Sequence, residues 1–342
     1  MDKVVVAYLF LSLLLYLILG GADFGAGIIE LMTSSGNRRR TRATLYHAIG
    51  PIWEANHMWL IIAIVILFVG FPFIYTELSI YLHIPLAIML LGIIARGTAF
   101  IFRHYDAISD DTHRIYNRVF IASSFITPLF LGIIAGSVVS GKIDHNGSGF
   151  IDVYIAGWMN WFSVSVGMFT VAICAYLAAV YLIGEAQNEN DRKRFLRKAK
   201  VMNIASFLCG GVVFLASLVD DVPLLEWVFG SAVGILAVIL ATVSLLSMWT
   251  FLRRGYVWLP RIMAGFQVAM ILLAISYAHF PYFILLKDGV KLSLFDHQAP
   301  PTTMLMLGGA LLLGSVFILP ALYYLYYSFK KTDDIFIEDS HQ

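Results

Sequence analysis

Charged residues are scarce in this 342-residue sequence: Asp, Glu, Lys and Arg make up 13% of it, whereas 60% of the residues are hydrophobic. Soluble globular chains average about 25% charged and about 45–50% apolar residues, so the composition excludes an ordinary soluble protein. The net charge of +1 removes the argument for nucleic acid or another polyanion as a partner. Polar stretches are short, so residues 1–342 are expected to form a single membrane domain.

Cysteine is nearly absent, since the chain contains only Cys174 and Cys209. Both lie inside apolar runs and lack the spacing of metal ligands. The sequence therefore argues against a disulfide framework or a metal centre held by cysteine, and both thiols are predicted to be buried as small apolar groups.

Long apolar runs dominate what is present. A bilayer core of ~30 Å requires about 20 apolar residues in helical form, and nine runs reach that length. The first lacks a small-residue cleavage site and is predicted to be a retained helix. We therefore expect an all-α integral membrane protein of about nine transmembrane helices, with a first four-helix group in 1–140 and the remaining helices in 153–330. The predicted spans are Val4–Leu31, Ala48–Phe71, Ile80–Phe102, Val119–Ser140, Val153–Ile183, Val201–Val219, Val222–Leu252, Val257–Leu286 and Thr302–Phe329.

The basic residues between these runs predict an orientation. Eighteen of the 23 Lys and Arg residues fall in connections that share one side, and four fall on the other. Because short cytoplasmic loops are rich in Lys and Arg, the amino terminus is predicted to lie outside and the carboxyl terminus in the cytoplasm. The longest charged stretch, 184–200, is predicted to be a cytoplasmic basic loop. It is either a solvated loop that sets topology or a site for lipid or a partner.

Three ionisable residues lie within the predicted spans, where charge is costly and usually functional: Asp23, Glu54 and Arg96. At 1.5 Å per residue they lie ~30 Å, ~9 Å and ~24 Å along the first, second and third helices. Because neighbouring helices run in opposite directions, all three are predicted to lie in the cytoplasmic part of the membrane, within reach of one another.

The residues around these charges are also unusual. The segment GGADFGAG (20–27) contains four glycines, which favour close helix approach and tolerate local unwinding. The second helix opens with Pro51, Trp53, Glu54, Asn56 and Trp59. A carboxylate, an amide and an arginine at one depth suit a water-filled proton relay, but they also suit a buried ion pair that fixes helix register. Trp53 and Trp59 are candidates for an apolar oxygen path or for simple packing.

Histidine raises the possibility of haem, which usually takes an axial His or Met ligand. His57 and His104 both lie toward the predicted cytoplasmic side. No spacing marks them as a pair of ligands, and a histidine that forms hydrogen bonds within the bundle is the alternative interpretation. No metal site is predicted in this chain.

Three segments carry a family resemblance: GGADFGAG, the P-x-W-[D/E]-x-N-x-x-W-L pattern at 51–60, and the A-R-G-x-A-F-x-F-R pattern at 95–103. In this order they resemble subunit II of the cytochrome bd-type quinol oxidases. The resemblance implies a terminal oxidase of the aerobic respiratory chain in a bacterial or archaeal cytoplasmic membrane. The sequence departs from the family at Gly20 and Ile101, where an acid is frequent.

The resemblance also implies a division of labour. A partner, subunit I, would carry haems b and haem d and the quinol site, and a small single-helix subunit is a possible third chain. This chain would bind no cofactor of its own, would support subunit I, and would contribute to proton or oxygen access. The expected proton path consists of Glu54, Asp23, Asn56 and Arg96.

An alternative function is a secondary transporter that uses Asp23, Glu54 and Arg96 as its coupling site. That architecture requires a second Gly- or Pro-interrupted helix in the other half of the chain. Gly210-Gly211 is the segment that most resembles one.

Overall fold

The computed structural model describes residues 1–50, 53–105, 110–186 and 188–339. Within these residues, nine helical stretches are long and apolar enough to cross a membrane, and the sheet content is one two-stranded hairpin. The predicted all-α membrane fold with nine spans is therefore confirmed. Pro51 of the second sequence pattern lies outside the described residues.

The first part of the chain contains four of the spans together with short connecting helices. The first span is continuous but contains a π-helical turn, η1, and α3 and α5 are helices between spans. In order, the elements are α1 (Asp2–Leu15), η1 (Tyr16–Gly20), α2 (Gly21–Leu31), α3 (Ser35–Ile49), α4 (Trp53–Gly70), α5 (Pro72–Tyr81), α6 (His83–Tyr105) and α7 (Asp110–Ser140).

The second part contains the other five spans and the hairpin. Three of its helices begin at residues whose side chains accept a hydrogen bond from the backbone three residues later, namely Asn160, Asn188 and Ser231. The elements are α8 (Phe150–Tyr154), α9 (Trp161–Ile183), α10 (Glu189–Val219), α11 (Leu224–Phe229), α12 (Ala232–Arg253), α13 (Trp258–His279), β1 (Tyr282–Leu285), β2 (Lys291–Ser293) and α14 (Pro301–Asp339).

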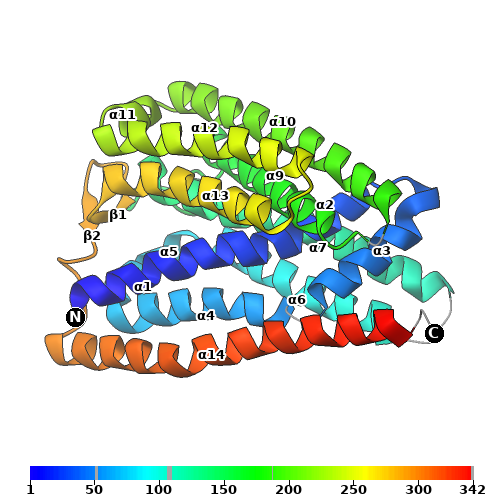
Figure 1. The fold of residues 1–342 in the computed structure, drawn as a ribbon. Coiled ribbons are helices and arrows are strands. Elements are labelled where there is room, and N and C mark those ends of the chain that lie inside the picture. The colour runs from blue at the N-terminus through cyan, green and yellow to red at the C-terminus, as the bar shows by residue number, and fades with distance from the viewer. Residues whose placement is uncertain (51–52, 106–109, 187, 340–342) are drawn as a thin grey trace.

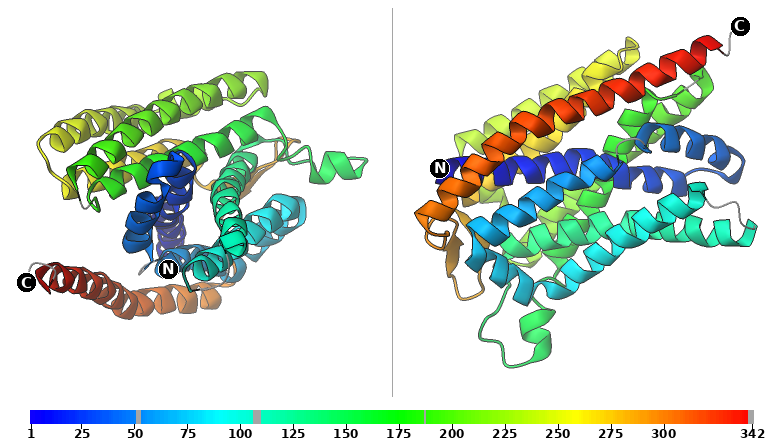
Figure 2. Two further views of the ribbon diagram at one scale, coloured as in Figure 1. Left: turned by 90° about the vertical axis from the view of Figure 1, so that its right-hand side faces the viewer. Right: turned by 90° about the horizontal axis from the view of Figure 1, so that it is seen from below.

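The helices run side by side, with α9 in the interior and α14 along one edge (Figures 1 and 2). Helix α9 packs against α2 and α7 on one side and against α10 and α13 on the other. In its most apolar stretch 78% of the residues are buried, compared with 6% in α14. Helix α9 is therefore the core element that joins the two parts, and α14 presents its apolar surface outward.

Several boundaries differ from those predicted. The predicted basic loop 184–200 is helical from Glu189, because Asn188 caps α10 and the amphipathic basic segment extends that helix beyond the apolar run. The break at Asp220 is present, and Asp221 adopts a positive φ of 56° in that turn. The predicted span 153–183 begins instead at Trp161, because residues 155–160 form a turn after α8.

The glycines of α2 bring it close to two neighbours. A Cβ added to Gly25 would collide with the backbone carbonyl of Cys174 in α9, and one added to Gly27 would collide with Ser124 in α7. Close helix approach at these glycines is thus a property of the fold. The local unwinding that four glycines would tolerate does not occur. The irregular turn η1 ends at Gly20, the first of the four, and α2 continues as a regular helix through Gly21, Gly25 and Gly27.

Candidate functional site: buried ion pairs between α2 and α6

The predicted contact between Asp23 and Arg96 is present. Arg96 Nη1 donates to Asp23 Oδ2 at 2.7 Å, and Nη2 donates to Oδ1 at 2.7 Å and to the Asp23 carbonyl oxygen at 2.8 Å. Both side chains are almost completely buried. A two-pronged contact of this kind satisfies the carboxylate while holding the guanidinium plane in one orientation.

The remaining surface of Arg96 is also occupied. Its Nε donates to Ser124 Oγ at 3.2 Å, and its guanidinium carbon lies 5.2 Å from the Phe24 ring centre and 5.1 Å from that of Phe120. Cations over aromatic faces gain electrostatic energy when water is excluded. Arg96 is therefore fixed by α2 and α7 together.

A second buried ion pair lies further along the same two helices, and the sequence reasoning missed it. Glu30 of α2 is fully buried; Arg103 Nη1 donates to its Oε2 at 2.8 Å, and Arg42 Nε of α3 donates to its Oε1. Arg103 also lies 4.2 Å from the Phe120 ring centre. The Phe120 ring therefore contacts both arginines of α6.

The spacing of these pairs was readable in the sequence. Glu30 follows Asp23 by seven residues, and Arg103 follows Arg96 by the same interval. Seven residues make about two helical turns, or ~10.5 Å, so each pair of residues lies on one helix face. The first and third spans run in the same direction, and equal spacing therefore predicts two ion pairs in register. Glu30 was overlooked because it lies next to the polar end of its span.

His57 of α4 lies beside the first pair. Its Nε2 is 3.7 Å from Asp23 Oδ2, and its ring is within 6.2 Å of the ring centres of Tyr16, Phe24 and Trp53. Its Nδ1 has no hydrogen-bond partner among the described residues. This close aromatic packing fits a histidine held inside the bundle rather than one facing a haem-sized space.

Glu54, by contrast, is not part of the buried cluster. It lies in the first turn of α4 with its side chain exposed, and it forms no ion pair or hydrogen bond with the residues the structure describes. Asn56 on the same helix is buried, and its Oδ1 has no partner there. The structure thus brings Asp23 and Arg96 together and leaves Glu54 at the surface of this chain.

The two tryptophans occupy different surroundings. Trp53 is half-buried, its ring centre is 5.7 Å from that of Phe100, and its ring fills the space that a side chain on Gly97 would need. Trp59 is buried in an apolar cluster with Tyr16, Phe24 and other residues. Both therefore have a packing role.

Chemically, the buried pairs and the exposed acid differ. Asp23 and Glu30 each contact a guanidinium group, which places a counter-charge beside each buried carboxylate. Glu54 is exposed and has no such partner among the described residues.

Comparison with known proteins identifies the family. The family described as "Cytochrome bd terminal oxidase subunit II" matches residues 1–329. The chain belongs to this family. The resemblance inferred from the three sequence segments is confirmed. Together with the nine apolar helices found in the described part of the chain, it identifies a multi-pass protein of the bacterial cytoplasmic membrane.

Individual relatives support the same family. The chain is similar to cytochrome bd ubiquinol oxidase subunit 2 of Bacillus subtilis, with 29% identity over 63% of this chain and 59% of the relative. It is similar to cytochrome bd-I ubiquinol oxidase subunit 2 of Escherichia coli, with 25% identity over 47% of this chain and 43% of the relative. The matches thus span about two-fifths to three-fifths of these relatives' lengths.

A solved structure shares the whole fold. The chain is similar to one in the bd oxidase from Geobacillus thermodenitrificans, with a TM-score of 0.75 and 20% identity, covering 96% of this chain and 98% of the other. At this identity the likeness concerns architecture. The helix arrangement described above is therefore that of a bd oxidase chain.

Proposed function

We propose that this protein is the second subunit of a quinol:oxygen oxidoreductase, the terminal oxidase of an aerobic respiratory chain. The observation that carries the proposal is the family match across residues 1–329, which includes nearly all of the nine-helix fold. In this proposal the haems b, haem d and the quinol site belong to a partner, subunit I. This chain is inactive alone, and a small single-helix subunit is a further candidate partner.

The ion pairs support a scaffolding role. Asp23 with Arg96 and Glu30 with Arg103 fix α2 against α6, and Ser124, Phe120 and α7 complete the contact. A subunit that positions a haem-bearing partner requires a rigid surface, and buried, mutually satisfied charges provide fixed register.

We assign proton access to the first turns of α4. Glu54 is exposed at the start of α4. The buried Asn56 and the half-buried His57 follow it on the same helix, and Asn56 Oδ1 and His57 Nδ1 have no hydrogen-bond partner among the described residues. Asp23 and Arg96 are then structural neighbours of this path, through the 3.7 Å approach of Asp23 to His57. Protons from the cytoplasm would pass Glu54 toward the partner.

Copurification tests the assembly. An affinity tag on this chain should recover a second multispan chain together with visible haem bands. Haem bands from this chain purified alone would contradict the division of labour, and recovery without any multispan partner would contradict the proposed complex.

A Glu54→Gln variant tests the proton path. In the assembled complex it should slow oxygen reduction while haem content stays normal, because an amide cannot exchange a proton as a carboxyl group does. Glu226→Gln, an exposed acid at the opposite end of the bundle, is the matched control and should leave turnover unchanged. Normal turnover in the Glu54 variant would exclude the relay role; loss of haem would assign Glu54 to assembly.

The transporter alternative gains no support. Its expected second broken helix would include Gly210-Gly211, but both glycines lie inside the uninterrupted α10. The transporter would also require Asp23, Glu54 and Arg96 to form one coupling site. Asp23 and Arg96 form a buried ion pair, whereas Glu54 is exposed and is not part of it.

A further inference from the structure

A basic hollow lies where two helix connections meet, away from the ion pairs of α2 and α6. The described residues 184–186 and 188 belong to the connection between α9 and α10, and 254–257 join α12 to α13. The two connections touch, because the position a Cβ would take on Gly184 is occupied by Val257 and Arg261. Arg261 also donates to the Tyr181 carbonyl at 2.7 Å and to Glu185 at 2.6 Å. These contacts hold the hollow's two walls together.

The hollow has a volume of about 330 Å³, within the range of small-ligand sites. Its wall contains four cationic side chains and one carboxylate, and its floor is aliphatic. Its lining residues include Glu189, Arg192, Lys193, Leu196, Arg253 and Arg254. Four cations against one acid leave a strong positive excess.

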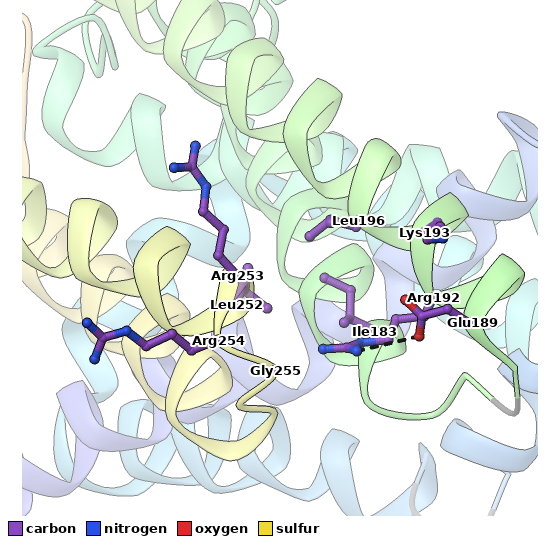
Figure 3. Close-up of a pocket in the computed structure, with 9 residues that line it drawn as sticks. All are labelled: Ile183, Glu189, Arg192, Lys193, Leu196, Leu252, Arg253, Arg254 and Gly255. Carbon is purple, nitrogen blue, oxygen red and sulfur yellow. Dashed lines mark ion pairs between the residues drawn. The ribbon is translucent and has the colours of Figure 1, made fainter.

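The side chains come from both walls (Figure 3). Arg192 of α10 reaches toward the end of α12, where its Nη2 would lie 3.7 Å from a Cβ on Gly255. Arg253 and Arg254 line the hollow at the end of α12, and their guanidinium groups extend to different sides of that end, away from Arg192. Among the described lining residues, Glu189 is the one carboxylate. Its Oε2 lies 3.6 Å from Arg192 Nη1 and its side chain is 64% exposed, so this ion pair is weak and another anion can compete for Arg192.

The surroundings are those of a membrane boundary. Apolar helix α12 ends at Arg253, and exposed apolar side chains continue from the hollow along both neighbouring helices. On α10 they include Val201, Ile204 and Phe207, and on α12 Val243 and Leu246. An anionic group bound here can therefore be attached to acyl chains that cover this apolar surface.

We propose that this hollow binds the phosphate headgroup of an anionic phospholipid, with its acyl chains along α10 and α12. Basic pockets between membrane helices on the positively charged side recognise such headgroups. The same cations would also attract free inorganic phosphate, but only a lipid also gains from the aliphatic floor and the exposed apolar helix faces.

Native mass spectrometry of the complete complex tests the site. Phosphatidylglycerol or cardiolipin is titrated against phosphatidylcholine, and inorganic phosphate serves as a separate arm. Each cation near an anionic headgroup contributes roughly fivefold in affinity, so Arg253→Gln with Arg254→Gln should weaken anionic lipid binding roughly 25-fold. Arg39→Gln with Arg40→Gln removes two exposed charges from α3 and should leave binding unchanged.

Three results would overturn the proposal. If the α3 control weakened lipid binding as much as the Arg253 and Arg254 variant, the effect would come from diffuse charge. If phosphatidylcholine bound as tightly as the anionic lipids, the anionic headgroup would have no role. If millimolar phosphate displaced the lipid, the site would belong to a soluble anion. A normal haem spectrum in both double variants verifies that the complex is folded. The result is independent of the Glu54 test, because neither variant alters α4.

Discussion

The strongest test of the buried ion pairs is a double-mutant cycle on Asp23 and Arg96. Arg96→Met removes three hydrogen bonds to Asp23 and leaves its carboxylate buried without a counter-charge. Asp23→Leu leaves the guanidinium group unpaired in the same way. Breaking one side of a buried pair costs about 3–5 kcal/mol, so each single variant should be strongly destabilised.

The double variant should be much milder than the two single variants combined. With both charges gone, neither group is left uncompensated, and an apolar pair of similar volume is often tolerated at a buried position. We expect a coupling free energy of at least about 3 kcal/mol between the two sites. The measurement is SDS-driven unfolding in mixed micelles, with Arg39→Met in exposed α3 as a control that should change nothing. Additive single effects would refute the reasoning, since they would mean that the two groups do not depend on each other.

Three further predictions concern other contacts. Glu30→Gln should raise hydrogen exchange in α3, because an amide binds Arg42 less strongly than the carboxylate; unchanged exchange would contradict this. Gly25→Ala should lower the free energy of unfolding by more than about 1 kcal/mol, because its Cβ collides with α9. Gly211→Ala has open space around it and should raise the free energy of unfolding by about 1 kcal/mol in the same assay. Lys287 lowers the pKa of Asp144 and Asp144 raises that of Lys287, so their contribution should be present above about pH 4 and lost as pH falls through the lowered pKa of Asp144. Proteolysis of the 141–149 connection should therefore accelerate in acid, and Lys287→Gln should abolish that dependence.

How much of the fold the sequence predicts follows from the physics of the bilayer. Apolar length and basic alternation predict nine spans, because an apolar run of about 20 residues crosses the bilayer as a helix that satisfies its own backbone polar groups. The ends of helices are less predictable. Most residues from Glu189 to Lys200 are polar, yet they extend α10, because the Asn188 cap starts the helix and Phe195 and Ala199 are buried on one of its faces. Helix length therefore exceeds apolar length.

For the site, depth alone predicted the Asp23–Arg96 pair correctly but wrongly added Glu54 to it. The position along a helix gives the depth of a residue in the membrane, but two residues touch only if they also lie on helix faces that meet. Glu54 lies on an exposed face of α4, away from Asp23 and Arg96. Glu30 was missed for the opposite reason, since its position near a loop concealed its complete burial. The equal seven-residue spacings, Asp23 to Glu30 and Arg96 to Arg103, indicate which helix face each residue lies on, which depth alone does not.

The register of α2 and α6 has a consequence for how the chain enters the membrane. A charged residue inside a membrane helix is costly to insert, up to about 2.5–3.5 kcal/mol for an arginine at the helix centre, and Arg96 lies within the third span. Its carboxylate partner lies in the first span, which is synthesised and inserted earlier, so Asp23 is already in place when the third span emerges. Integration of that third span should thus depend on the first, and a nascent chain with Asp23 replaced should leave α6 poorly inserted before any partner subunit is encountered.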